Sequence, residues 1–116
     1  MRKPPLHNSF FNAFRGVLRM VKSERNFQIE TAAFFINLFL IFYLKLTTTD
    51  AVLIIIISSA VLAAEIFNTA IERICDILQP EFDKRIGFIK DISAGAVLLL
   101  TVASVITGIL IYWKYI

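Results

Sequence analysis

Two glutamates and an asparagine interrupt an apolar stretch of the sequence, at spacings that place them together on a helix. Glu65 and Asn68 are three residues apart, Glu72 follows four residues later, and Asp76 continues the series. Residues three and four apart share one helical face. Because ionisable groups inside a membrane are costly and mark functional sites, this face predicts proton or cation handling, or a metal-dependent reaction on a lipid headgroup. The simpler alternative is that these polar groups only join helices by hydrogen bonds.

Charged residues also gather next to the other two apolar stretches. Glu24 and Glu30 lie where the first stretch begins, and Lys90 and Asp91 lie where the last one begins. Proteins commonly bind Mg²⁺ through one or two carboxylates, and substrate phosphates complete its shell. These clusters therefore predict a site for Mg²⁺ and phosphate. The four glycines are scattered, and the sequence contains no P-loop or dinucleotide-binding fingerprint.

The composition indicates the environment in which these groups are held. Of the 116 residues, 58% are hydrophobic and 18% are charged, and the mean hydropathy is +0.74. Soluble domains have close to half apolar and about a quarter charged residues, so this excess indicates a lipid environment. A membrane-spanning helix needs roughly 20 apolar residues. Three spans would use nearly the whole chain, which excludes a separate soluble nucleotide-binding domain, hydrolase or DNA reader.

Three stretches have the length and apolar character of spans, so the predicted fold class is an all-α membrane protein. The spans are expected over residues 28–46, 51–73 and 91–113. The segment 74–90 is expected to be a cytoplasmic loop. Thr47 to Asp50 are expected to form a turn, in which Asp50 caps the following helix.

The basic residues predict the orientation of these spans. The chain has 12 Lys and Arg against nine Asp and Glu, a net charge of +3. Only Lys45 and Lys114 lie on the side of the membrane opposite the N-terminus and the 74–90 segment. Cytoplasmic segments carry the excess of Lys and Arg, so in the cytoplasmic membrane the N-terminus is expected inside and the C-terminus outside. The positive charge therefore indicates topology and not nucleic-acid binding.

Residues 8–23 have a helical pattern but are too polar for a span. One side of the helical wheel is apolar and the opposite side is polar and basic. The apolar side carries Phe10, Ala13, Phe14, Val17, Met20 and Val21, and the polar side carries Asn12, Arg15, Arg19 and Lys22. This pattern predicts an amphipathic helix that lies on the cytoplasmic leaflet. The alternative is a soluble helix packed on the loop before the third span.

Together these motifs resemble the small integral-membrane diacylglycerol kinase and undecaprenol kinase family of bacteria. The matching motifs are Ser23-Glu24-Arg25-Asn26, the run from Glu65 to Glu72, Asp76, and Lys90-Asp91 with Ala94-Gly95-Ala96-Val97. The resemblance covers almost the whole chain. It implies a homotrimer of three-span subunits with a cytoplasmic surface helix, which transfers the γ-phosphoryl group of MgATP to a lipid hydroxyl.

The resemblance also implies roles for individual residues. Glu65 looks like the general base that takes the proton of the lipid hydroxyl, and Asn68 would orient Glu65 or the phosphoryl group. Glu24 and Glu72 look like the carboxylates that bind Mg²⁺. The residues where the family contacts nucleotide are Asn12, Glu24, Glu72, Asp76, Glu81, Phe82, Asp83, Lys90 and Asp91. The residues expected to contact the lipid are Arg15, Arg19, Glu30 and Glu65.

The sequence leaves the acceptor lipid open between two candidates. The motifs around Glu24 and Glu72 are more similar to undecaprenol kinases. Glu30, where those enzymes usually have a histidine, is similar to diacylglycerol kinases instead. An arginine that some relatives carry near the start of the surface helix corresponds to about Pro5, so its role is either vacant or passes to Arg2, Arg15 or Arg19.

Two other kinds of protein are compatible with the same residues. A small cation- or proton-coupled transporter would use Glu65 as its carrier group, although such transporters often contain internal repeats and this sequence shows none. A non-enzymatic membrane scaffold would bind partners through its surface helix and its polar face.

Overall fold

The structure is a computed structural model, and it describes residues 5–116. These residues form four α-helices and a short 3₁₀ turn: α1 (Leu6–Ser23), α2 (Arg25–Tyr43), α3 (Thr48–Leu78), α4 (Lys84–Tyr112) and η1 (Trp113–Tyr115). Three helices, namely α2, α3 and α4 continued by η1, are long and apolar enough to cross a membrane. The prediction of an all-helical chain with three span-length helices is confirmed.

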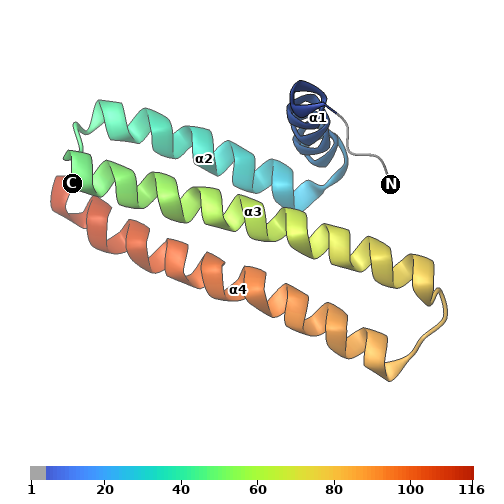
Figure 1. Cartoon of the computed structure of the whole chain (residues 1–116). Helices are drawn as coiled ribbons and strands as arrows, with labels where there is room; N and C mark the ends of the chain where they lie inside the picture. The colour runs from blue at the N-terminus through green and yellow to red at the C-terminus, as the bar shows by residue number, and fades with distance from the viewer. Residues whose placement is uncertain (1–4) are drawn as a thin grey trace.

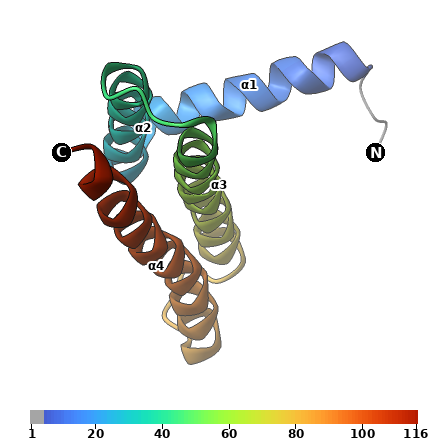
Figure 2. The ribbon, with the colours of Figure 1, turned by 90° about the vertical axis from the view of Figure 1, so that its left-hand side faces the viewer.

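The three long helices lie side by side, and α3 packs against both α2 and α4 (Figure 1). In contrast, α1 crosses their direction at the start of α2 and extends away from them (Figure 2). The change of direction occurs at Glu24, whose backbone is extended with φ −108° and ψ 114°. Its amide still donates to the carbonyl oxygen of Met20 at 2.9 Å. A single residue therefore separates α1 from α2.

The helices on either side of the expected 74–90 loop are longer than predicted. α3 continues to Leu78 and α4 begins at Lys84, so only residues 79–83 of that segment are non-helical. Hydropathy reports the apolar part of a helix, whereas the helix itself continues until a residue stops it, here just before Pro80. At 1.5 Å per residue, the 31 residues of α3 extend about 46 Å. That length exceeds the roughly 30 Å of hydrocarbon, so the polar end of α3 projects beyond it.

The start of α3 also differs from the prediction. The N-cap is Thr47, whose Oγ1 accepts a hydrogen bond from the amide of Asp50 at 3.2 Å. The carboxylate of Asp50 instead accepts hydrogen bonds from Lys114 Nζ at 2.9 Å and from the Tyr115 hydroxyl at 2.7 Å. That hydroxyl in turn accepts one from the amide of Thr47 at 3.0 Å. The prediction that Asp50 caps α3 was wrong because its carboxylate has a charged partner after α4.

A buried aromatic residue near the α1–α2 junction gives a test of this packing. Phe27 is 2% exposed. We expect Phe27→Ala to lower the free energy of unfolding by about 3 kcal/mol, the low end of the range for buried aromatics. The low end is expected because lipid is as apolar as the protein interior, so the substitution costs mainly the packing contacts of the ring. Unfolding by sodium dodecyl sulfate in mixed micelles measures this change. The control Phe42→Ala removes a ring that is 82% exposed and should change stability by less than about 0.5 kcal/mol; equal losses would contradict the packing.

Candidate active site

Glu65 lies in a groove between the long helices. Glu65 is only 8% exposed. The groove has a volume of about 260 Å³, and Asn26 of α2 and Asn68 of α3 line it together with Glu65. The rest of its wall comes from α4, through Ala94, Val97, Leu98 and Thr101. The groove therefore combines polar groups from α2 and α3 with a mainly apolar wall, which suits a molecule with a polar head and an apolar chain.

Three other carboxylates lie within electrostatic range of Glu65. They belong to Glu30 of α2, Glu72 of α3 and Glu24 at the α1–α2 junction. Like charges this close disfavour one another unless a cation or a proton compensates them. Among residues 5–116, no three His, Cys, Asp or Glu side chains form a complete metal cage. One or two carboxylates are nevertheless the usual protein ligands of Mg²⁺ when phosphates complete the shell, so this donor set fits Mg²⁺.

The side-chain amide of Asn68 is satisfied at only one end. Its Nδ2 donates to Glu72 Oε1 at 3.4 Å. Its Oδ1 is buried and has no hydrogen-bond partner in the described part of the chain. A buried acceptor without a donor is costly, and such groups often have a catalytic or ligand-binding role. Asn68 therefore lines the groove that contains Glu65 with an amide that is only partly satisfied, and its Nδ2 positions Glu72 at the same time.

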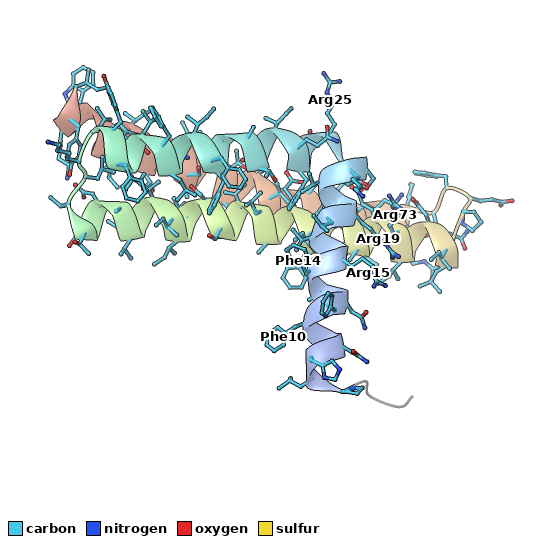
Figure 3. The ribbon with its side chains drawn as sticks, turned by 90° about the horizontal axis from the view of Figure 1, so that it is seen from above. Phe10, Phe14, Arg15, Arg19, Arg25 and Arg73 are labelled. Atoms are coloured by element: carbon cyan, nitrogen blue, oxygen red, sulfur yellow. The ribbon has the colours of Figure 1, made fainter. Side chains whose placement is uncertain are left out.

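Glu24 is paired with a cation from α3. Arg73 Nη2 donates to Glu24 Oε1 at 2.9 Å, which connects the α1–α2 junction to α3. Figure 3 shows that Arg25, the residue next to Glu24, points away from α3. The predictions did not include Arg73. The two partners are 49 residues apart in the sequence, and no spacing rule relates them.

A second groove lies where α3, the 79–83 loop and α4 meet. Its volume is about 270 Å³. Its lining includes Asp76, Glu81, Phe82, Asp83 and Lys90, which are five of the residues predicted to contact nucleotide. Lys90 Nζ forms an ion pair with Asp76 Oδ1 at 2.6 Å. The structure thus brings these five residues together from two helices and a loop.

Asp83 in this groove also stabilises the start of α4. Its Oδ1 accepts hydrogen bonds from the Arg85 amide at 2.8 Å and from Arg85 Nε at 3.2 Å, and its Oδ2 accepts one from Nη2 at 2.9 Å. The Arg85 guanidinium lowers the pKa of Asp83 from 3.8 to about 2. Because this pKa is depressed on folding, the cap is fully stabilising above pH 3.8 and is lost only as the pH falls through about 2.

The predicted site residues on α1 lie outside both grooves. Asn12, Arg15 and Arg19 are exposed. Figure 3 shows Arg15 and Arg19 on the opposite side of α1 from Phe10 and Phe14. The two arginines point toward the end of the bundle that carries the 79–83 loop, and the two rings point along the bundle in the other direction.

The remaining predicted residues fall in three different places. Asp91 is exposed on α4 and lines neither groove. Glu30 is half-buried on α2. Arg2 lies outside the described residues. Conversely, Asn26 and Thr101 line the Glu65 groove without having been predicted as site residues; the signal that could have pointed to Asn26 is its place in the Ser23–Asn26 motif.

Three span-length helices around a groove with one buried carboxylate define an integral membrane protein with the features of an enzyme site. The chain belongs to the prokaryotic diacylglycerol kinase family, because the family model described as "Prokaryotic diacylglycerol kinase" matches residues 11–112. It is therefore a phosphotransferase with an alcohol group as acceptor, as the resemblance implied. Membership of a kinase family supports neither the transporter nor the scaffold alternative.

The relatives carry two different kinase names. Undecaprenol kinase of Bacillus subtilis (strain 168) is 34% identical over 104 residues, which cover 90% of this chain and 85% of the relative. Diacylglycerol kinase of Synechocystis sp. is 33% identical over 109 residues, which cover 90% of this chain and 61% of the relative. Diacylglycerol kinase of Escherichia coli (strain K12) is 27% identical over 103 residues, which cover 89% of this chain and 84% of the relative.

Proposed function

We propose that this lipid kinase transfers the γ-phosphoryl group of ATP, with Mg²⁺, to the hydroxyl of a membrane lipid in the groove that contains Glu65. The observation that carries this proposal is the combination of a buried carboxylate, an unpaired Asn68 Oδ1 and an apolar α4 wall in one groove. A lipid has the matching chemistry, because its hydroxyl needs a base and polar surroundings while its chain needs an apolar surface.

Glu65 is the general base of this reaction. If Thr48 marks the outer boundary, about 20 residues of helix cross the hydrocarbon, and the inner boundary falls near Asn68. Glu65 then lies about one helical turn inside the boundary, a depth that a lipid hydroxyl reaches. As the hydroxyl oxygen bonds to the γ-phosphorus and the bond to the leaving ADP breaks, Glu65 takes the hydroxyl proton. Asn68, which lines the same groove, orients Glu65 or the phosphoryl group.

Glu24 and Glu72 are the carboxylates that hold Mg²⁺. Both lie within electrostatic range of Glu65, and Asn68 Nδ2 orients Glu72. When bound, Mg²⁺ neutralises the charge of the phosphates, which is the main requirement of phosphoryl transfer. The role of the chain is to keep these two carboxylates at the polar end of the lipid groove.

The second groove binds the nucleotide. Lys90 is its cation, and the loop residues Glu81, Phe82 and Asp83 border it together with Asp76. Asn12 and Asp91 complete the proposed nucleotide contacts from α1 and α4. This assignment places the nucleotide at the end of the bundle where α3 and α4 extend beyond the apolar stretch.

The proposed topology has the N-terminus and the 79–83 loop in the cytoplasm and the C-terminus outside. We propose that α1 lies on the cytoplasmic leaflet, because Phe10 and Phe14 point along the spans and Arg15 and Arg19 point away from them (Figure 3). In this position the two arginines contact lipid phosphates. Glu30 contributes to the lipid site through its proximity to Glu65.

We also propose that the chain forms a homotrimer. A groove of about 350 Å³ between α3 and α4 supports close approach of another helix, since small residues favour helix contacts in membranes. Its small lining residues are Ala60, Ala63, Ala64, Ser93 and Ala96.

We propose undecaprenol as the preferred acceptor and diacylglycerol as the second. The 34% identity to an undecaprenol kinase and the motifs around Glu24 and Glu72 support this order. The test incubates purified protein with MgATP and separate pools of undecaprenol, diacylglycerol and ceramide, and measures phosphorylated lipid. Undecaprenyl phosphate should form fastest. Absence of any phosphorylated lipid, together with uptake of a cationic dye into liposomes, would contradict the kinase and favour the transporter.

A further inference from the structure

We propose that Arg73 is a phosphate-binding residue that is held on Glu24 until metal and nucleotide arrive. In the free protein its guanidinium neutralises Glu24. When a metal ion binds Glu24, the guanidinium moves to a phosphate of the nucleotide. This inference rests on the proposed function, because it takes Glu24 as a metal carboxylate.

The geometry of the pair favours exchange over a permanent structural contact. A single nitrogen of Arg73, Nη2, contacts a single oxygen of Glu24 at 2.9 Å. The guanidinium has five N–H donors, and strong arginine–carboxylate pairs usually engage two of them in parallel. The Arg73 side chain is 66% exposed and that of Glu24 is 31% exposed. Exposed single contacts of this kind contribute little stability, so the pair opens easily.

Arg73 is also placed to contact a phosphate once metal and nucleotide have bound. It directly follows Glu72 on α3, and its side chain reaches the α1–α2 junction where Glu24 lies. A phosphate held through a metal on Glu24 and Glu72 is therefore within the range of the same side chain. A planar guanidinium binds phosphate oxygens in pairs, so the nucleotide offers Arg73 a better partner than the one it leaves.

A comparison with the other groove shows the same arrangement. Lys90 is paired with Asp76 at 2.6 Å, and both residues line the proposed nucleotide site. Each cation thus neutralises a carboxylate in the free protein. For Arg73 the exchange keeps charges compensated in both states, because the metal replaces it on Glu24, which avoids unpaired charges near the membrane.

This role predicts that removing Arg73 changes metal and nucleotide binding in opposite directions. Without the competing guanidinium, Glu24 is free and the metal binds more tightly. Without the phosphate partner, the nucleotide binds more weakly. A purely structural role, in which Arg73 only ties α3 to the junction, predicts that both bind more weakly because Glu24 loses its position.

The experiment compares Arg73→Gln, Arg73→Lys and wild type in detergent micelles without lipid. The dissociation constant of Mn²⁺ alone, measured by electron paramagnetic resonance, should fall up to about fivefold in Arg73→Gln, as for loss of one exposed competing ion pair. That of MgATP should rise about tenfold, as for loss of one charge-assisted hydrogen bond. Arg73→Lys should restore part of the nucleotide binding. Arg25→Gln is the matched control, because it removes a cation beside Glu24 that points away from α3 (Figure 3); both constants should stay within about twofold.

Two outcomes would overturn the role of Arg73: weaker binding of both ligands to Arg73→Gln, or no change in either. Unfolding by sodium dodecyl sulfate should show that Arg73→Gln is as stable as Arg25→Gln. The failure of the proposed function is recognised separately, since wild-type protein would then bind no Mn²⁺ and phosphorylate no lipid.

Discussion

Replacing Glu65 with Gln is expected to lower the rate of lipid phosphorylation by about 10²- to 10⁴-fold, which is the contribution of a general base. Gln preserves the shape of the side chain and its hydrogen bonding but does not accept a proton at neutral pH. Nucleotide binding should be retained, because the substitution removes no proposed ligand of Mg²⁺ or ATP. The rate is measured with purified protein, MgATP and undecaprenol, and nucleotide binding is measured separately by titration.

The control for this substitution is Asp50→Asn at the opposite end of α3. It also removes a buried carboxylate, and it leaves an oxygen that can accept from Lys114 and Tyr115. Since Asp50 lies far along α3 from the groove, the variant should keep most of the wild-type rate. Near-normal turnover by Glu65→Gln would exclude Glu65 as the base, and equal losses in both variants would indicate a general loss of structure.

The double substitution Glu24→Gln with Glu72→Gln is expected to lower kcat by about 10²-fold or more, because charge neutralisation by a bound metal contributes several kcal/mol. Each single substitution should raise the Mg²⁺ concentration needed for half-maximal rate, and excess Mg²⁺ should restore part of the rate. The double variant should not respond to excess Mg²⁺. Titrations of Mg²⁺ at saturating ATP measure these differences.

The single variants need a check on folding, because Glu24→Gln also weakens the ion pair with Arg73. Unfolding in mixed micelles should show stabilities close to that of wild type, as expected for an exposed ion pair. An unchanged rate and Mg²⁺ dependence in the double variant would show that neither carboxylate holds the metal.

Much of this architecture follows from local properties of the sequence. Apolar runs of span length predicted three long helices, and the structure contains them. The three- and four-residue spacings of Glu65, Asn68 and Glu72 predicted a shared face, and the hydrogen bond from Asn68 to Glu72 lies on it. Helical spacing determines such neighbours without knowledge of the rest of the fold.

Other features depend on packing between distant segments and were not predictable in this way. The pairing of Glu24 with Arg73 requires the change of direction between α1 and α2 to bring the junction against α3. The partner of Asp50 comes from the end of α4. The spans predicted from hydropathy did not show how far α3 continues after the second span or how early α4 begins before the third. Hydropathy detects contact with lipid, whereas helix continuation depends on backbone hydrogen bonds and on residues such as Pro80.

The hydrogen bonds of Asp50 have a consequence for biosynthesis. Its partners Lys114 and Tyr115 are 64 and 65 residues further along the chain. When the α2–α3 hairpin leaves the ribosome, neither of these partners has been synthesised. The two contacts form only after α4 has been inserted, so the assembled bundle is secured by contacts that form late in translation. An incompletely synthesised chain would thus lack both partners of the Asp50 carboxylate.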